Sequence, residues 1–258
     1  GLIGSLLVGS TFVKSLSMTL NKPFYPINHL EGHILSPTFN NKVKFPYLCF
    51  LLTGGHTQIY LVNSIGKYKL LGETIDDAVG EAFDKVAKLL DLPYPGGPSI
   101  EYSAKTGDIN AVNLPHPLKK YKNLNFSFSG IKTSVNLHIK KNGMNKNLVK
   151  NISASFQNKI SEILIEKLNL CLQELKNNNV YVNDLALVGG VAANKFLRLK
   201  IKNECTKKNI NLIVPPKKMF GDNAGMIAWA CIQKLKHSKI KNDLYFRPNP
   251  RLEIENKL

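Results

Sequence analysis

Short apolar runs bounded by glycine, proline and polar residues alternate along the chain with stretches of helical periodicity. The runs "YLCFLL" (47–52) and "QIYLV" (58–62) are joined by "TGGHT", which predicts a β-hairpin with a glycine turn. Two later runs, "DLALV" (184–188) and "INLIVPP" (210–216), predict two further strands. Because strands alternate with helices, the sequence predicts an α/β fold.

Residues 74–92 predict a helix after the hairpin. Its apolar positions recur at helical spacing, at Val79, Phe83, Val86, Ala87 and Leu90. Asp76 and Asp77 stand where an N-cap and a negative first turn are favourable. Asp77, Glu81 and Asp84 share one face of the helix. We interpret Asp77 and Glu81 as part of a solvated face, whereas we predict that Asp84 faces a cleft and accepts hydrogen bonds from ribose hydroxyls.

Further segments complete the predicted organisation. Residues 153–176 predict a long amphipathic helix, and a second helix follows the glycines after the 184–188 strand. Residues 222–235 predict a third helix with Asp-Asn as its cap. The opening stretch, 2–16, predicts the first turns of a buried helix. Residues 104–147 are rich in Lys, Asn and Pro and predict a lobe of mixed structure.

Composition adds a strong positive charge to this picture. The 258 residues include 35 Lys and Arg against 18 Asp and Glu, a formal charge of +17. Such an excess is typical of proteins with an anionic partner such as nucleic acid. Abundant lysine and asparagine are also what AT-rich coding produces, and arginine occurs only at Arg198, Arg247 and Arg251. An RNA-facing surface and a solvated, coding-biased surface therefore both stay open.

The cysteines and the longest apolar runs indicate where the protein resides. No C-x-x-C pair occurs, which is typical of reduced, buried thiols in a cytosolic protein, here Cys49, Cys171, Cys205 and Cys231. No apolar run reaches the ~18 residues of a membrane span. We therefore predict a cytoplasmic protein with no membrane partner.

Glycine pairs occur at three places beside predicted elements. A strand that leads into glycines at a helix N-terminus offers free backbone N–H groups to a phosphate. None of the pairs belongs to a Walker A or G-x-G-x-x-G motif, so a tight turn explains each one taken alone. Their repetition favours a nucleotide ligand. The pairs are Gly54-Gly55, Gly96-Gly97 and Gly189-Gly190.

Two histidines in "INHLEGH" raise the question of a metal site. His29 and His33 are four residues apart, a spacing that in a helix lets two imidazoles reach one ion. Glu31 would then point away, and the pattern differs from H-E-x-x-H. Asp222 in "FGDNAG" is the candidate third ligand, and a role as an N-cap explains its position equally well. A surface accident is the alternative for the pair.

Six blocks of sequence resemble one family in the correct order. They are "INHLEGH", "LLTGGHTQIY", "GETIDDAVGEAFDKVAKLLDLPYPGGP", "NFSFSGIKTS", "LVGGVAANKFLR" and "DNAGMIAWA". Together they resemble the tRNA N6-adenosine threonylcarbamoyltransferases, formerly described as O-sialoglycoprotein endopeptidases or glycoproteases. The resemblance implies an actin-like ATPase fold, in which two ribonuclease-H-like lobes enclose a nucleotide cleft.

The resemblance also implies an activity in tRNA processing. The family transfers a threonylcarbamoyl group from threonylcarbamoyl-adenylate to N6 of adenosine 37 in tRNAs that read codons beginning with A. This acyltransferase reaction needs no covalent nucleophile, because the adenylate already activates the acyl carbon, and the general base stays unassigned. The implied partners are tRNA, the adenylate and the partner subunits of the tRNA threonylcarbamoyladenosine complex.

Site residues follow from the matching blocks. His29, His33 and Asp222 would hold one Fe2+ (or Zn2+) per subunit, as a two-histidine, one-carboxylate set with open positions. The metal would orient and polarise the carbamoyl donor. The implied substrate-binding residues are Leu51, Leu52, Thr53, Gly54 and Gly55 on the hairpin and Asp84, Gly97, Glu101 and Asn194 around the nucleotide.

The resemblance implies a division of the chain as well. Family members start with a further N-terminal segment, so we expect a truncated first lobe beside a complete second lobe. Residues 1–44 would be the remnant of the first lobe, with its first forty residues poorly anchored. Residues 45–219 would form the second, adenylate-binding lobe, and 220–258 would return to the first. Two alternatives stay open, an ATP-dependent kinase of the same superfold and an inactive truncated fragment.

Overall fold

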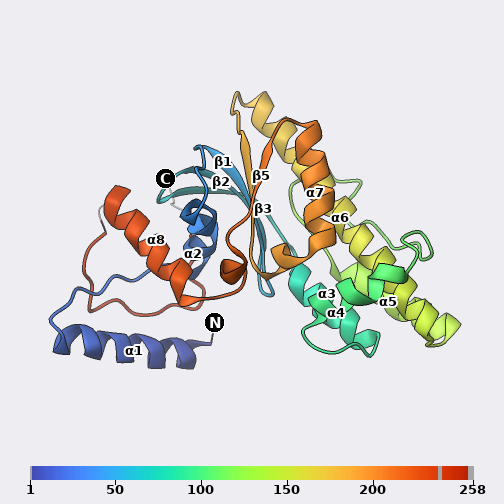
Figure 1. Cartoon of the computed structure of the whole chain (residues 1–258), viewed down its shortest axis with the longest axis horizontal. Coiled ribbons are helices and arrows are strands. Elements are labelled where there is room, and N and C mark those ends of the chain that lie inside the picture. Colours follow the sequence, from blue (N-terminus) through green and yellow to red (C-terminus); the bar gives the residue numbers. More distant parts are fainter. Residues whose placement is uncertain (1, 238–239, 255–258) are drawn as a thin grey trace.

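A mixed five-stranded sheet forms the centre of the computed structural model, which describes residues 2–237 and 240–254. The strand order is β3-β2-β1-β4-β5, with β1, β2 and β3 antiparallel and β1, β4 and β5 parallel (Figure 1). The strands are β1 (Tyr47–Leu52), β2 (Thr57–Ser64), β3 (Lys67–Glu73), β4 (Asp184–Val188) and β5 (Asn211–Ile213). The predicted α/β class and hairpin are confirmed, and β3 is an additional strand.

Both faces of β1 are buried, because helices cover the sheet on each side. Every residue of β1 is at most 1% exposed. Successive side chains of a strand point to opposite faces. One face therefore contributes Leu48, Phe50 and Leu52 to the larger core, and the other contributes Tyr47, Cys49 and Leu51 to a smaller core. This arrangement explains why "YLCFLL" is continuously apolar rather than alternating.

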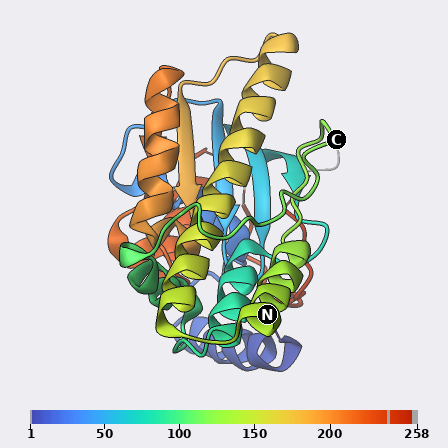
Figure 2. The ribbon, with the colours of Figure 1, turned by 90° about the vertical axis from the view of Figure 1, so that its right-hand side faces the viewer.

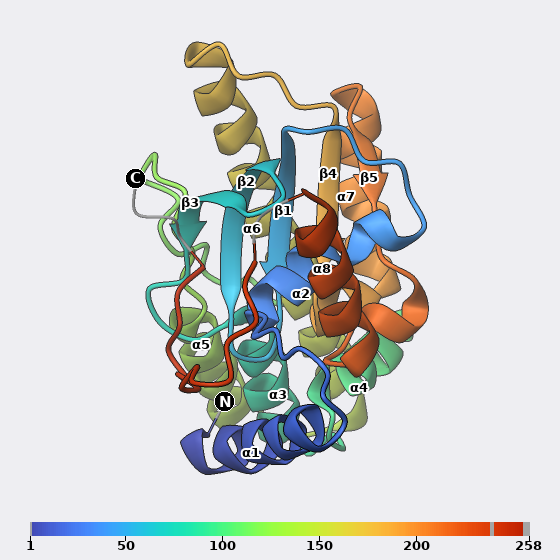
Figure 3. The same cartoon turned by 90° about the vertical axis from the view of Figure 1, so that its left-hand side faces the viewer.

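The larger core lies under a layer of helices that cover one face of the sheet (Figure 2). These helices are α3 (Val79–Leu89), α4 (Gly96–Ser103), α5 (Ser129–Asn142), α6 (Lys146–Asn177) and α7 (Lys195–Lys207). The opposite face carries α2 (His29–Leu35) and α8 (Ala224–His237) (Figure 3). Short 3-10 helices connect these elements, namely η1 (Ser36–Phe39), η2 (Ala104–Thr106), η3 (Gly190–Ala193) and η4 (Lys217–Met219).

Helices α3 and α6 begin several residues away from their predicted starts. The helix predicted over 74–92 begins only at Val79, because the Val79 N–H donates to Thr57 Oγ1 at 2.8 Å and Ala78 is the N-cap. Asp76 does not cap the helix, since its carboxylate binds the segment at 127–129 instead. The long helix α6 begins before the predicted residue 153, at Lys146, where Asn145 accepts a hydrogen bond from Leu148 N.

The first helix, α1 (Ile3–Thr19), is not buried as its apolar pattern predicts, and its exposure agrees with the expectation that the first forty residues are poorly anchored. Ser17 is its one buried residue, whereas Val8 is 74% and Phe12 66% exposed. Figure 1 shows α1 below α2 and α8, and Figure 3 shows it at the bottom of the molecule, below the sheet. Its apolar side chains are exposed because neither face of the sheet packs against it in the described part of the chain.

The segment after α1 is well anchored, contrary to expectation for the first forty residues. Residue Phe24 exchanges hydrogen bonds with the C-terminal segment, donating to Asn242 Oδ1 at 2.8 Å and accepting from Asp243 N at 3.0 Å. Residues Leu30 to Leu35 of α2 are buried. The lobe boundaries predicted at residues 44 and 219 stay predictions. Part of the predicted C-terminal segment, residues 238–239 and 255–258, lies outside the described residues.

No helix in residues 2–237 and 240–254 combines the length and apolarity needed to cross a membrane.

Candidate functional site

Helix α2 presents two imidazoles on one side of its first turns. Asn28 caps the helix by accepting a hydrogen bond from Leu30 N at 2.9 Å. His29 and His33 then stand one turn apart, with ring centroids separated by 5.0 Å. The His33 side chain is fully buried and that of His29 is 45% exposed. The sequence prediction that the pair shares one helical face is therefore confirmed.

Asp222 comes from the loop before α8 and meets both histidines. Its Oδ1 lies 2.9 Å from His33 Nε2 and 3.2 Å from His29 Nε2. One ligand atom from each residue lies within 4.8 Å of the others, as a metal site requires. The N-cap interaction of α8 comes from Asn223, whose Oδ1 accepts from Met226 N at 2.8 Å. Of the two interpretations of Asp222 left open by the sequence, the capping role is thus wrong.

The electrostatics of these three groups suit metal ligation. Burial lowers the pKa of His33, although the hydrogen bond to Asp222 opposes the shift. Burial alone would raise the pKa of Asp222, but hydrogen bonds and positive charge from His29 and then His33 outweigh it, so the pKa is lowered. Neutral imidazoles and an ionised carboxylate are the forms that bind metal ions.

The chemistry of the donor set fits a divalent transition-metal ion. Two imidazole nitrogens and one carboxylate oxygen face one point, and each residue offers one atom to it. Both histidines turn Nε2 toward that point, while the buried Nδ1 of His33 has no hydrogen-bond partner among the described residues. His33 therefore has one nitrogen in the site and lacks the outer hydrogen bond that usually orients a histidine ligand.

A third histidine, His56, lies beside this centre and was missed by the sequence analysis. It belongs to the turn between β1 and β2, and its ring centroid is 6.5 Å from that of His29. Burial lowers the pKa of His56, and the neighbouring His29 adds to this effect. Only its position in the "TGGHT" turn could have drawn attention to it, because its approach to α2 depends on how the helix packs on the sheet.

Gly80 and Gly189 allow the end of β1 to pack closely against the start of α3 and the end of β4. A Cβ on Gly189 would lie 2.3 Å from Leu52 O, and one on Gly80 would lie 2.6 Å from Thr53 O. Gly189 also has φ +92°, a conformation that favours glycine. The carboxyl end of β1 therefore meets the end of β4 and the start of α3, the edge where ligands bind in open α/β sheets.

The predicted hairpin residues divide into two groups at this edge. Leu51 and Leu52 are buried in the two cores, so only their backbone groups can face a ligand. Thr53 Oγ1 accepts from Gly55 N at 3.2 Å and thereby shapes the turn. Gly54 and Gly55 are exposed, and no atom of the described residues lies within 4 Å of their Cβ positions, which leaves their backbone accessible. Their role in binding stays a prediction.

The predicted nucleotide residues lie along the helix layer at the same edge. Asp84 Oδ1 accepts from Gly96 N at 2.7 Å, and both line a cavity of about 530 Å³. Asp84 thus faces a cavity, as predicted, while Gly97 next to it has open space at its Cβ position. Glu101 Oε1 accepts from Lys195 N at 2.8 Å at the start of α7.

Asn194 has a structural partner already. Its Oδ1 caps α7 by accepting from Leu197 N at 2.9 Å, and the residue is 7% exposed. Asp84 thus accepts a hydrogen bond from Gly96, and Glu101 accepts one from Lys195, which follows Asn194. The binding roles of these residues are not tested by the geometry and stay predictions.

Fold and site together define an α/β protein of actin-like fold with a two-histidine, one-carboxylate set of potential metal ligands. The fold resembles the crystal structure of full-length HypF in its phosphate- and nucleotide-bound form, with a TM-score of 0.64 and 14% identity. That likeness covers 87% of this chain and 38% of HypF and concerns the fold alone.

Sequence comparison defines the family. The family model of tRNA N6-adenosine threonylcarbamoyltransferase matches residues 1–229. Enzymes of that name from Wolbachia pipientis wMel and Rickettsia bellii (strain OSU 85-389) are 44% and 47% identical. Each alignment covers 99% of this chain and 75% of the relative. The chain belongs to the tRNA N6-adenosine threonylcarbamoyltransferase family, and the resemblance inferred from six blocks is confirmed.

Proposed function

We propose that this protein is an acyltransferase that transfers a threonylcarbamoyl group to N6 of adenosine 37 in tRNAs that read codons beginning with A. The names of its relatives give the threonylcarbamoyl group and N6 of an adenosine in tRNA, while position 37 and the codon class come from the family resemblance. We further propose threonylcarbamoyl-adenylate as the donor. The alternative of an ATP-dependent kinase is not favoured, because the family match extends over residues 1–229.

The observation that carries the proposal is the convergence of His29, His33 and Asp222 on one point in a chain of this family. We infer that these residues hold one Fe2+ or Zn2+, since imidazole nitrogens and a single carboxylate suit both ions. When bound, the metal supplies a Lewis acid that polarises the carbonyl of the donor. The ionised Asp222 and the buried, neutral His33 would keep the ligand set in its binding form.

The residues at the carboxyl end of β1 would bind the adenylate. The exposed backbone of Gly54 and Gly55 can approach a ligand closely, and Asp84 offers carboxylate oxygens to ribose hydroxyls. His56 lies in the same turn as the glycines and beside His29, so a donor that spans the turn and the metal centre would have its reacting carbonyl near the imidazoles. We propose that this arrangement orients the acyl carbon toward the incoming amine.

The test is a modification assay with product analysis. The protein is mixed with an unmodified tRNA transcript, threonylcarbamoyl-adenylate and partner subunits, and the digested nucleosides are identified by mass spectrometry. We expect threonylcarbamoyladenosine from the wild type, little from His33→Ala, and wild-type amounts from His237→Ala, an exposed histidine at the end of α8. Absence of the nucleoside, while the Rickettsia bellii relative modifies the same tRNA, would contradict the proposal.

A further inference from the structure

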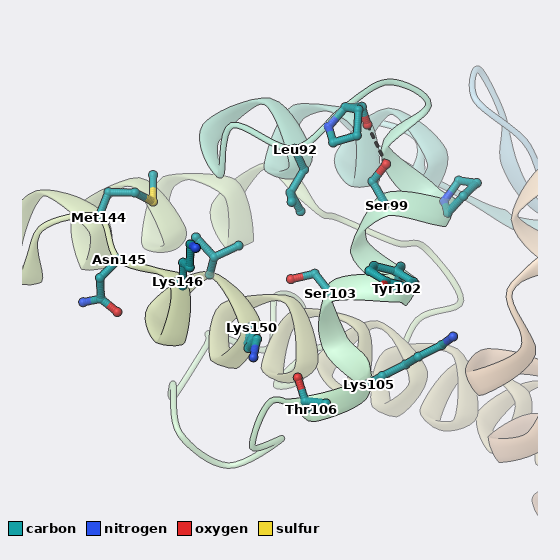
Figure 4. Close-up of a pocket in the computed structure, with 13 residues that line it drawn as sticks. Leu92, Ser99, Tyr102, Ser103, Lys105, Thr106, Met144, Asn145, Lys146 and Lys150 are labelled. Atoms are coloured by element: carbon teal, nitrogen blue, oxygen red, sulfur yellow. Dashed lines mark hydrogen bonds between the residues drawn. The ribbon is translucent and has the colours of Figure 1, made fainter.

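A groove on the helix layer lies apart from the residues discussed so far. It runs between α4 and the first turns of α6 and has a volume of about 1090 Å³ (Figure 4). The connection from α3 to α4 closes one end, where Ser99 Oγ donates to Pro93 O at 2.6 Å. Leu92 and Pro93 also line the cavity that contains Asp84, so the groove adjoins the predicted nucleotide residues.

Positive charge lines this groove on both sides. Lys105 lies beyond the end of α4, while Lys146 and Lys150 lie on α6 (Figure 4). Among residues 2–237 and 240–254, no Asp or Glu lines the groove. All three lysines are exposed, and none forms an ion pair with a carboxylate in the part of the chain that the structure describes. The groove therefore presents uncompensated positive charge.

An aromatic side chain accompanies the lysines. Tyr102 of α4 lines the groove, is 75% exposed, and has Lys105 Nζ 5.1 Å from its ring centroid. Tyr94, in the adjoining cavity, is 85% exposed. Lysines interspersed with exposed aromatic rings are the surface on which single-stranded nucleic acids bind, with phosphates on the lysines and bases on the rings.

We propose that the groove between α4 and α6 binds an RNA strand, with phosphates at Lys105, Lys146 and Lys150 and a base stacked on Tyr102. The assignment of that strand to the tRNA substrate rests on the proposed function. The groove would anchor the tRNA away from the metal centre. An acidic protein could also bind the lysines, but the exposed rings of Tyr94 and Tyr102 favour stacking with bases over contact with carboxylates.

The test measures binding of a fluorescent tRNA transcript over a range of salt concentrations. The variant Lys105→Gln/Lys146→Gln/Lys150→Gln removes the groove charges. Its matched control, Lys176→Gln/Lys202→Gln/Lys208→Gln, removes three exposed lysines at the end of α6, within α7 and just after α7. We expect the groove variant to bind the transcript about tenfold or more weakly at low salt. The slope of log affinity against log salt concentration should be shallower by about 2, because fewer phosphate contacts release fewer counterions on binding.

Tyr102→Ala provides a second, independent variant. It should weaken RNA binding about fivefold or more through lost stacking, with the salt slope unchanged because no charge is removed. Equal affinity of the groove variant and its control, or no RNA binding by the wild type, would overturn the proposal. Loss of binding in the groove variant combined with no tRNA modification by the wild type would instead contradict the proposed function alone.

Discussion

Glu31 and Lys234 form a partly buried ion pair that joins the two helices of the candidate metal centre. Lys234 Nζ of α8 donates to Glu31 Oε2 of α2 at 2.9 Å, and Glu31 is 2% exposed. Tyr68 on β3 donates to the other carboxylate oxygen at 2.8 Å. Glu31 points away from the histidines, as the sequence predicted, and there it holds their helix against the sheet and against the helix that follows Asp222.

Loss of this carboxylate should loosen the metal centre. Glu31→Ala removes the carboxylate that Lys234 and the Tyr68 hydroxyl contact, and the loss of a hydrogen-bonding partner at a buried position costs about 2 kcal/mol of unfolding free energy. Metal affinity should fall about tenfold or more, as when groups behind metal ligands are removed. Urea denaturation and metal titration measure the two effects.

Glu162→Ala is the control for that prediction, because Glu162 pairs with Lys159 on the surface of α6 and its side chain is 44% exposed. Such a pair contributes less than about 1 kcal/mol. If Glu31→Ala and Glu162→Ala changed stability and metal affinity equally, the joining role of Glu31 would be refuted.

Substitution of a proposed ligand should lower metal affinity, whereas substitution of the neighbouring helix cap should lower only stability. Asp222→Asn or His33→Ala should lower metal affinity by more than ~100-fold, since even groups behind the ligands contribute 10–100-fold. Asn223→Ala removes the cap of α8 and should cost about 1 kcal/mol of stability while metal content stays near that of the wild type. Elemental analysis after dialysis measures the metal; equal content in all variants would exclude this site.

The close approach at Gly189 should make that position intolerant of a side chain. Gly189→Ala places a methyl group 2.3 Å from Leu52 O in a residue with φ +92°, so we expect a loss of about 3 kcal/mol or more. At Gly190, next in the chain, the described residues place no atom within 4 Å of the Cβ position, so Gly190→Ala should cost at most about 1 kcal/mol. Thermal denaturation compares them, and equal melting temperatures would contradict the predicted packing of β1 on β4.

Asp76 should contribute pH-dependent stability. Burial raises the pKa of its carboxyl, but hydrogen bonds from Ser127, Phe128 and Ser129 outweigh burial, so the pKa in the folded protein is lowered. The folded state thus favours the ionised form. Its stabilisation is complete above the unfolded-chain pKa of about 3.9 and is lost as the pH falls through the folded pKa.

Asp76→Asn should therefore reduce stability at neutral pH by about 1 kcal/mol, a modest value because the residue is exposed, and should flatten the acid side of the stability profile. Glu174→Gln, which removes another exposed carboxylate, is the control. Parallel profiles for Asp76→Asn and the wild type below pH 5 would contradict this account.

Several features followed from the sequence because they depend on neighbours along the chain. The hairpin of β1 and β2 was predictable from two apolar runs and a glycine turn. His29 and His33 share a helical face because four residues nearly complete a helical turn. Six blocks in the correct order indicated the family, because each block is a continuous run of residues that can be recognised without its neighbours in space.

Other features required the tertiary structure, because they join residues far apart in the chain. Whether Asp222 caps a helix or faces the imidazoles depends on Asn223, which takes the cap, and on how α8 lies beside α2. His56 and Tyr68 reach the same region through the sheet. The exposure of α1 likewise depends on the tertiary structure, since an apolar pattern indicates which side chains favour burial but not whether another element covers them.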